Sequence, residues 1–104
     1  MSIIIVATIT PKPEDRDDVI AALEKAENAV HEAEEGCLLY ALHESADGRL
    51  VMIEKYADQA AFEAHGTGAG LKALIGDLNG KLASPMDVKI LTPHPAGHPD
   101  KGVL

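Results

Sequence analysis

Three side chains that can move a proton or hold an aromatic ring, Glu54, Tyr56 and His65, follow one another closely in the sequence. Glu54 and Tyr56 alternate in a run that predicts a strand, so both side chains lie on one face of a sheet. Asp58 is a favourable N-cap residue, and the short helix that it begins has His65 at the end of its apolar face. Because a strand that leads directly into a helix folds back on itself, we expect Tyr56 and His65 to line one cavity.

A histidine in such a cavity can act as general acid or base near neutral pH, and a nearby carboxylate such as Glu54 can orient it. Tyr56, Tyr40 and Phe62 are candidates to contact an aromatic ligand or to wall its cavity. Each residue also has a structural interpretation. His65 could cap the end of its helix, Glu54 could form an ion pair with a neighbouring strand, and the aromatic rings could be core packing.

The remaining chemically active residues form no recognisable site. Cys37, the only cysteine, is expected to be a small buried hydrophobic residue. The glycines of residues 66–70 follow a helix and not a strand, so they do not match a phosphate-binding loop. His94 and His98 lie in a polar segment, and two imidazoles alone make a weak metal site. We therefore predict neither a metal nor another cofactor.

The composition predicts one globular domain and excludes two classes of partner. The chain has 104 residues and a formal net charge of -8, so it lacks the basic clusters that nucleic acids and anionic membranes require. A single cysteine allows no intrachain disulfide. The N-terminus has no basic leader, and its apolar run is too short for a signal peptide or a membrane span. We expect a cytoplasmic protein.

The sequence pattern predicts the elements that position these residues. Strands are expected at residues 3–10, 37–45, 50–56 and 86–90, and helices at 13–35, 59–66 and 71–78, with Asp47-Gly48 as a hairpin turn and Gly36 as a helix stop. This order is the β-α-β-β-α-β arrangement of ferredoxin-like α+β domains with an antiparallel sheet. The domain should span residues 1–92, and residues 93–104 should form a flexible C-terminal tail or arm.

Glu34 and Glu35 lie at the C-terminal end of the first helix, where the helix dipole disfavours negative charge, and the sequence offers no reason for this.

The predicted strands are apolar on both faces. Residues 3–6, 37–42 and 50–53 show continuous apolar runs instead of strict alternation. Two helices can cover only one face of a four-stranded sheet. We therefore expect a homodimer in which the sheets of two copies pack face to face.

Residues 36–40, the Asp47-Gly48 hairpin and residues 54–65 resemble the antibiotic biosynthesis monooxygenase (ABM) family, and the resemblance extends from Ile3 to Leu91. It implies a dimeric α+β barrel. Some members of the family oxidise phenols or quinols with dioxygen and use neither metal nor prosthetic group. Others degrade haem, isomerise small metabolites or have no known activity.

Four residues match common positions of the family: Glu54, Asp58, Ala61 and His65. Tyr56 stands where many members carry Trp, and Gly70 stands where a second His is common. The haem-degrading branch relies on an Asn in the first strand, a Trp and a later His, which are absent here.

The resemblance thus implies a cofactor-independent monooxygenase that oxidises a small phenol, quinol or polycyclic aromatic. In this hypothesis His65 takes the proton of the substrate hydroxyl, and Glu54 orients the His65 side chain. The rings of Tyr56, Phe62 and Tyr40 form the walls of the cavity. Two alternatives remain open. One is an isomerase or lyase of the same fold, and the other is a non-catalytic dimeric module that binds a small molecule.

Overall fold

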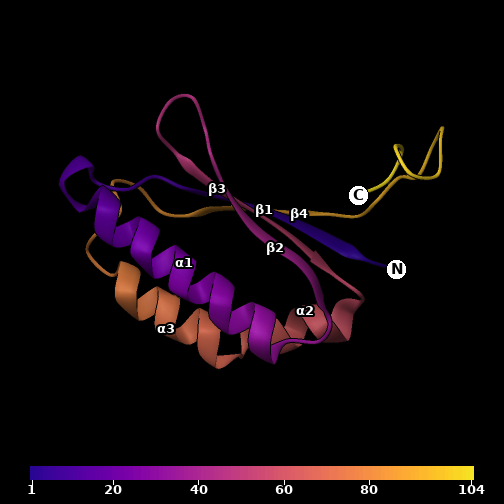
Figure 1. Ribbon diagram of the computed structural model, residues 1–104, viewed down its shortest axis with the longest axis horizontal. Coiled ribbons are helices and arrows are strands. Elements are labelled where there is room, and N and C mark those ends of the chain that lie inside the picture. Colours follow the sequence, from indigo (N-terminus) through magenta and orange to yellow (C-terminus); the bar gives the residue numbers. More distant parts are fainter.

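The computed structural model describes residues 1–104 as one four-stranded sheet with helices on one face (Figure 1). The elements are β1 (Ile3–Ile9), a short 3-10 helix (Pro13–Asp15), α1 (Arg16–Ala33), β2 (Cys37–Glu44), β3 (Leu50–Tyr56), α2 (Gln59–Gly66), α3 (Ala69–Leu78) and β4 (Asp87–Leu91). Their order confirms the ferredoxin-like α+β prediction.

The sheet has the strand order β2-β3-β1-β4, and every neighbouring pair is antiparallel. β1 is central: Ile5 pairs with Glu54 of β3 on one side and with Ile90 of β4 on the other. This register places Ile5, Glu54 and Ile90 on the face of the sheet that the helices cover.

The alternation along β3 decides which side chains face the helices. Leu50, Met52, Glu54 and Tyr56 are all buried, whereas the residues between them are only half-buried. Since successive side chains of a strand point to opposite faces, the buried set faces the helices. α1 covers this set with an apolar stripe formed by Val19, Ala22, Leu23, Ala26 and Val30.

The predicted helix stop at Gly36 is wrong. α1 ends at Ala33, and the backbone of Gly36 does not adopt the positive φ of a glycine helix cap. Gly36 is needed for another reason, because a Cβ on it would lie 2.5 Å from the Cβ of Ala61. The missing side chain lets α2 approach the start of β2 closely.

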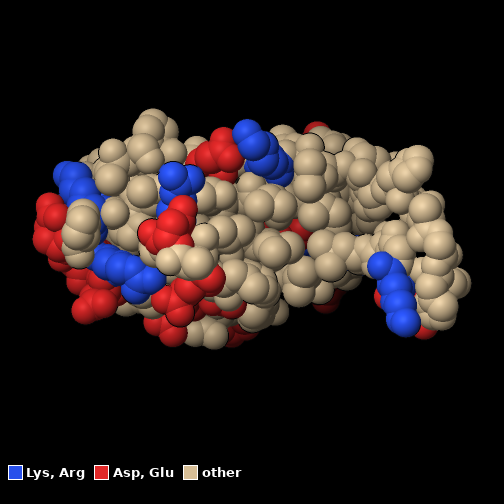
Figure 2. Space-filling view, turned by 90° about the horizontal axis from the view of Figure 1, so that it is seen from above, with Lys and Arg blue, Asp and Glu red and all other residues tan.

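The other face of the sheet, which we call the open face, has no helix over it. Its apolar residues are Ile4, Val6, Leu39, Ala41, Val51, Ile53 and Leu91, and its polar residues are Thr8, His43, Lys55, Asp87 and Lys89. Figure 2 shows the molecule from this side: most charged residues lie toward one end, a few lie at the upper edge and at the other end, and the centre is largely uncharged. β4 is more exposed than expected, since all five of its residues are exposed and not only alternate ones.

The last residues, Pro93–Leu104, extend away from the sheet beyond β4 (Figure 1). They form a turn in which the amides of Lys101 and Gly102 donate to the carbonyl of His98, at 3.1 Å and 2.8 Å. None of the α-helices combines the length and the hydrophobicity that a membrane span requires.

Candidate functional site

A cavity of about 190 Å³ lies between the sheet and the helices. It is lined by Ile5, Ala7, Ile9, Leu23, Tyr40, Met52, Glu54, Phe62, His65, Gly66, Leu71, Leu74, Met86 and Val88. The side chains of Glu54 and His65 are the only ionisable groups among them besides the phenol of Tyr40. The cavity is therefore an apolar space with a few polar groups, which is typical of a small-molecule site.

Two elements bring Glu54 and His65 together. Glu54 lies on β3 at a position that faces the helices, and its side chain is 7% exposed. Asp58 fixes the start of α2, because its Oδ1 accepts a hydrogen bond from the amide of Ala61 at 2.8 Å. The last turn of α2 then directs His65 back over β3, where its side chain is 6% exposed.

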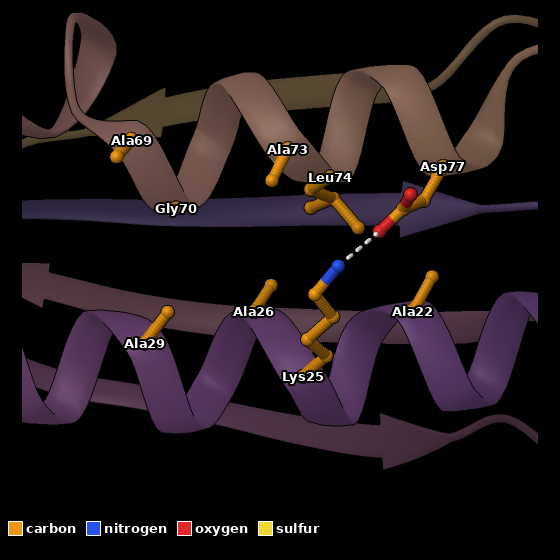
Figure 3. Close-up of a pocket in the computed structure, with 9 residues that line it drawn as sticks. All are labelled: Ala22, Lys25, Ala26, Ala29, Ala69, Gly70, Ala73, Leu74 and Asp77. Carbon is orange, nitrogen blue, oxygen red and sulfur yellow. Dashed lines mark hydrogen bonds and ion pairs between the residues drawn. The ribbon is translucent and has the colours of Figure 1, made fainter.

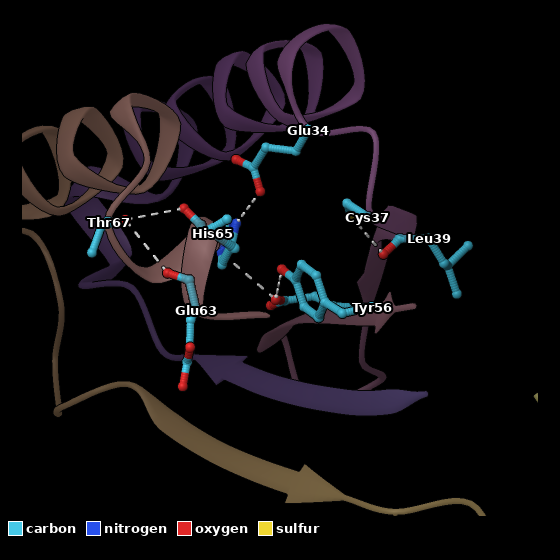
Figure 4. A network of polar contacts seen from close by, with 9 residues as sticks. Glu34, Cys37, Leu39, Tyr56, Glu63, His65 and Thr67 are labelled. Atoms are coloured by element: carbon cyan, nitrogen blue, oxygen red, sulfur yellow. Dashed lines mark hydrogen bonds and ion pairs between the residues drawn. The ribbon is translucent and has the colours of Figure 1, made fainter. Parts of the chain in front are cut away.

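His65 is held between two carboxylates (Figure 4). Its Nδ1 lies 2.9 Å from Oε1 of Glu34, and its Nε2 lies 3.8 Å from Oε1 of Glu54. The same Glu54 oxygen accepts the hydroxyl of Tyr56 at 2.6 Å. An ionised carboxylate can only accept a hydrogen bond, so the contact with Glu34 places the hydrogen of a neutral imidazole on Nδ1. The lone pair then lies on Nε2, on the side of Glu54.

Burial dominates the electrostatics of this cluster. It raises the pKa of the Glu54 carboxyl, and the hydrogen bond from Tyr56 acts in the opposite direction. Burial also raises the pKa values of the Tyr40 and Tyr56 phenols, which therefore remain protonated at neutral pH. Cys37 behaves likewise: burial raises the pKa of its thiol to about 11, which leaves little reactive thiolate.

Four of the five site residues expected from the sequence line the cavity: Tyr40, Glu54, Phe62 and His65. Tyr56 does not. It is fully buried behind Glu54, with its ring centroid 5.1 Å from that of His65 and 5.5 Å from that of Phe62. Its hydroxyl is engaged by Glu54, so it contacts the site through that carboxylate.

Glu34 was not expected at the site. It follows the end of α1 and reaches His65 across 31 positions of sequence. The one signal in the sequence was its unfavourable place at the C-terminal end of a helix. The structure supplies the missing reason, because the carboxylate faces His65 and also lies beside Gly68, the N-cap of α3, where the helix dipole favours negative charge.

Gly70 lies away from the cavity. A Cβ on it would lie 3.4 Å from Cγ2 of Val30 and 3.6 Å from Cβ of Ala29, both on α1. The glycine thus allows close contact between α1 and α3. The two helices also enclose a shallow hollow of about 140 Å³, lined mainly by alanines and crossed by an ion pair of 3.2 Å between Lys25 and Asp77 (Figure 3).

Nowhere in the chain do three or more His, Cys, Asp or Glu side chains gather in an arrangement that could hold a metal ion.

Comparisons with known proteins agree with this architecture. A family model described as "Antibiotic biosynthesis monooxygenase" matches residues 2–76. The "Putative monooxygenase Rv0793" of Mycobacterium tuberculosis is 34% identical over 93 residues, which cover 86% of this chain and 88% of that protein. The solved structure of Rv0793 superposes with a TM-score of 0.86 over 94% of this chain and 100% of its own, and pairing residues in space gives 28% identity. A Caulobacter crescentus crystal structure described with the same family name gives a TM-score of 0.82 at 26% identity, over 86% and 87% of the two chains.

Proposed function

The chain belongs to the antibiotic biosynthesis monooxygenase family, and from this premise we propose that it oxidises a small phenol or quinol with dioxygen without a cofactor. The observation that carries the proposal is the apolar cavity into which His65 and Glu54 both project. A hydroxyl group bound there would meet an imidazole already held in one orientation.

The volume of the cavity favours a one-ring substrate. It is about 190 Å³, whereas a cavity of about 150 Å³ suffices for benzene and sites for drug-sized ligands start near 300 Å³. A substituted phenol or hydroquinone therefore fits better than the polycyclic substrates that the family resemblance also allows.

In the proposed reaction Nε2 of His65 takes the hydroxyl proton of the bound phenol. The phenolate is electron-rich and reacts with dioxygen at a ring carbon. A carbon–oxygen bond forms, the oxygen–oxygen bond breaks, and the ring carbon loses its hydrogen. One phenol and one dioxygen thus give one quinone and one water, and the substrate supplies all the electrons.

The other residues of the cluster support His65. Glu54 lies on the Nε2 side of the ring and orients the substrate hydroxyl, while the hydroxyl of Tyr56 fixes the Glu54 carboxylate. Phe62 and Tyr40 form aromatic walls and exclude water.

We also propose that the protein is a homodimer joined through the open face. The face has apolar side chains on all four strands, including Val6, Ala41, Ile53 and Leu91, and the helices leave it uncovered. A second copy of the same sheet is the simplest cover, and it would form the α+β barrel that the family resemblance implies.

The proposed function is tested by dioxygen uptake of the metal-stripped protein with a panel of hydroquinones and one-ring and two-ring phenols. We expect the wild type to consume dioxygen and His65→Ala to lose roughly a hundredfold or more in kcat/KM, the scale of a lost acid–base group. His94→Ala, in the exposed C-terminal segment, is the matched control and should keep wild-type activity.

Two results would contradict the proposal. Absence of uptake with every substrate would exclude the monooxygenase. Substrate conversion without dioxygen would indicate an isomerase or lyase that uses the same histidine.

A further inference from the structure

A second hollow lies on the outer side of the His65 cluster. It has a volume of about 390 Å³, and Glu34, Glu35, Gly68 and Gly70 are among the residues that line it. We call it the outer hollow. Several of its lining residues, including Ala33, Glu35 and Ala64, are exposed, so it is open to solvent.

Glu34 connects the outer hollow with His65. Its Oε1 lies 2.9 Å from Nδ1 of the imidazole. Its Oε2 lies near Gly68 and Gly70, 3.3 Å and 3.9 Å from the positions that a Cβ on each would occupy. Both glycines line the outer hollow. One carboxylate thus faces the imidazole with one oxygen and the outer hollow with the other.

The three groups form a continuous path between the two spaces. Glu54 and His65 line the inner cavity, and Glu34 lines the outer hollow. Glu34, at the outer end, has the most exposed side chain of the three, at 15%, compared with 6% for His65 and 7% for Glu54. The imidazole spans the path, because its two nitrogens face the two carboxylates.

We propose that Glu34 is a positioning and proton-relay residue, which keeps the hydrogen of His65 on Nδ1 and exchanges protons between His65 and solvent at the outer hollow. This inference rests on the proposed role of His65 as base.

When Nε2 of His65 takes the substrate proton, the proton on Nδ1 moves to Oε1 of Glu34. The imidazole therefore stays neutral while the phenolate reacts with dioxygen. Later Nε2 gives its proton to the peroxide formed from dioxygen, and Glu34 returns a proton to Nδ1. No proton is gained or lost over the cycle.

Two substitutions of Glu34 separate positioning from relay. Glu34→Gln keeps an oxygen that accepts the Nδ1 hydrogen, but an amide does not take up the proton. We expect the ring nitrogen chemical shifts of His65 to stay as in the wild type, the exchange of the Nδ1 hydrogen with water to slow, and dioxygen uptake to fall about tenfold or more. Glu34→Ala removes the acceptor, so the ring nitrogen shifts should change as well.

Chemical rescue gives a further readout that a purely structural role would not move. Glu34→Ala leaves space beside the outer hollow, and we expect added formate to restore much of the lost dioxygen uptake. Formate should not rescue Glu34→Gln, whose side chain fills that space. The matched control is Glu35→Ala, because Glu35 lines the same hollow but forms no hydrogen bond or ion pair with His65. Its dioxygen uptake and the ring shifts of His65 should equal those of the wild type.

The outcomes separate the two proposals. Wild-type uptake and wild-type hydrogen exchange in Glu34→Gln would overturn the relay, and unchanged ring shifts in Glu34→Ala would overturn the positioning. If the wild type consumes no dioxygen with any substrate, the proposed function fails, while the ring shifts and the Nδ1 exchange rate still decide the role of Glu34. If Glu34→Ala does not fold, as judged by circular dichroism, Glu34→Gln decides the relay by its exchange rate.

Discussion

At the scale of single residues, Glu54 combines two conditions that oppose one another. Its carboxylate is almost fully removed from water, which disfavours the charged form, yet it accepts a hydrogen bond of 2.6 Å from Tyr56. Burial prevails, and the pKa of Glu54 lies above the ordinary glutamate value of 4.5. The fold therefore holds this acid in place at the expense of stability.

The raised pKa predicts how stability depends on pH. Between pH 4.5 and the folded-state pKa, the unfolded chain has lost the Glu54 proton while the folded chain keeps it, so the free energy of unfolding falls as the pH rises. Glu54→Gln removes this dependence. We expect the wild type to lose stability relative to Glu54→Gln over this window, as measured by urea unfolding from about pH 4 to pH 8.

The control for this prediction is Glu63→Gln, which changes an exposed glutamate of α2. Its stability difference from the wild type should be nearly independent of pH. A stability difference for Glu54→Gln that is also flat, or that has the opposite sign, would show that burial does not raise the pKa of this carboxyl.

Four of the five site residues predicted from the sequence line the cavity, but the sequence did not show how each contributes. Strand alternation placed Glu54 correctly, and the offset from the Asp58 cap placed His65. Tyr56 shares the same strand face, yet strand geometry does not tell which residue of a face borders a void and which lies behind another side chain. Glu34 was beyond prediction as a site residue because its contact with His65 depends on how α1 and α2 pack, which no local pattern encodes.

At the scale of elements, the position of α2 depends on the space left by Gly36. A Cβ there would lie 2.5 Å from the Cβ of Ala61, closer than any real contact between such atoms, so α2 would have to move. That shift would carry His65 with it, since His65 lies in the last turn of the same helix.

Gly36→Ala should therefore destabilise the protein by about 1–3 kcal/mol, as overpacking does, measured by chemical unfolding. Gly76→Ala is the matched control: a Cβ there meets nothing within 4 Å, and we expect it to stabilise α3 by about 0.5–1 kcal/mol. The double variant Gly36→Ala/Ala61→Gly should recover part of the stability that Gly36→Ala loses. If it recovers nothing, the close approach of these two residues is not the cause.

The elements themselves were predicted well, because periodicity reports directly on them. The errors lie at the ends: the first helix ends at Ala33 and not at Glu35, and β4 begins at Asp87 and not at Met86. Local chemistry suggested a glycine cap at Gly36, but tertiary packing determines what that glycine does.

At the scale of the whole molecule, the open face of the sheet has a largely uncharged centre, and most of the charged residues lie toward one end (Figure 2). We expect light scattering coupled to gel filtration to give twice the protomer mass of 11.0 kDa. Ile53→Asp places a charge on this face and should yield monomers. Ile75→Asp is the control, because Ile75 is 59% exposed on α3, on the helix side of the molecule. A wild type that stays monomeric up to about 100 µM would refute the dimer.

The central place of β1 in the sheet has a consequence for folding during synthesis. β1 is the first of the four strands of this sheet to leave the ribosome, yet its two partners are residues 50–56 and residues 87–91. The second partner, β4, is the last of the four strands in sequence, so the sheet cannot be completed until residues 87–91 have been synthesised. The β2–β3 hairpin, by contrast, joins neighbours in sequence and closes a short loop. A nascent chain can therefore form this hairpin and the β1–β3 pairing early, but the edge strand that carries Val88 to the cavity is added last.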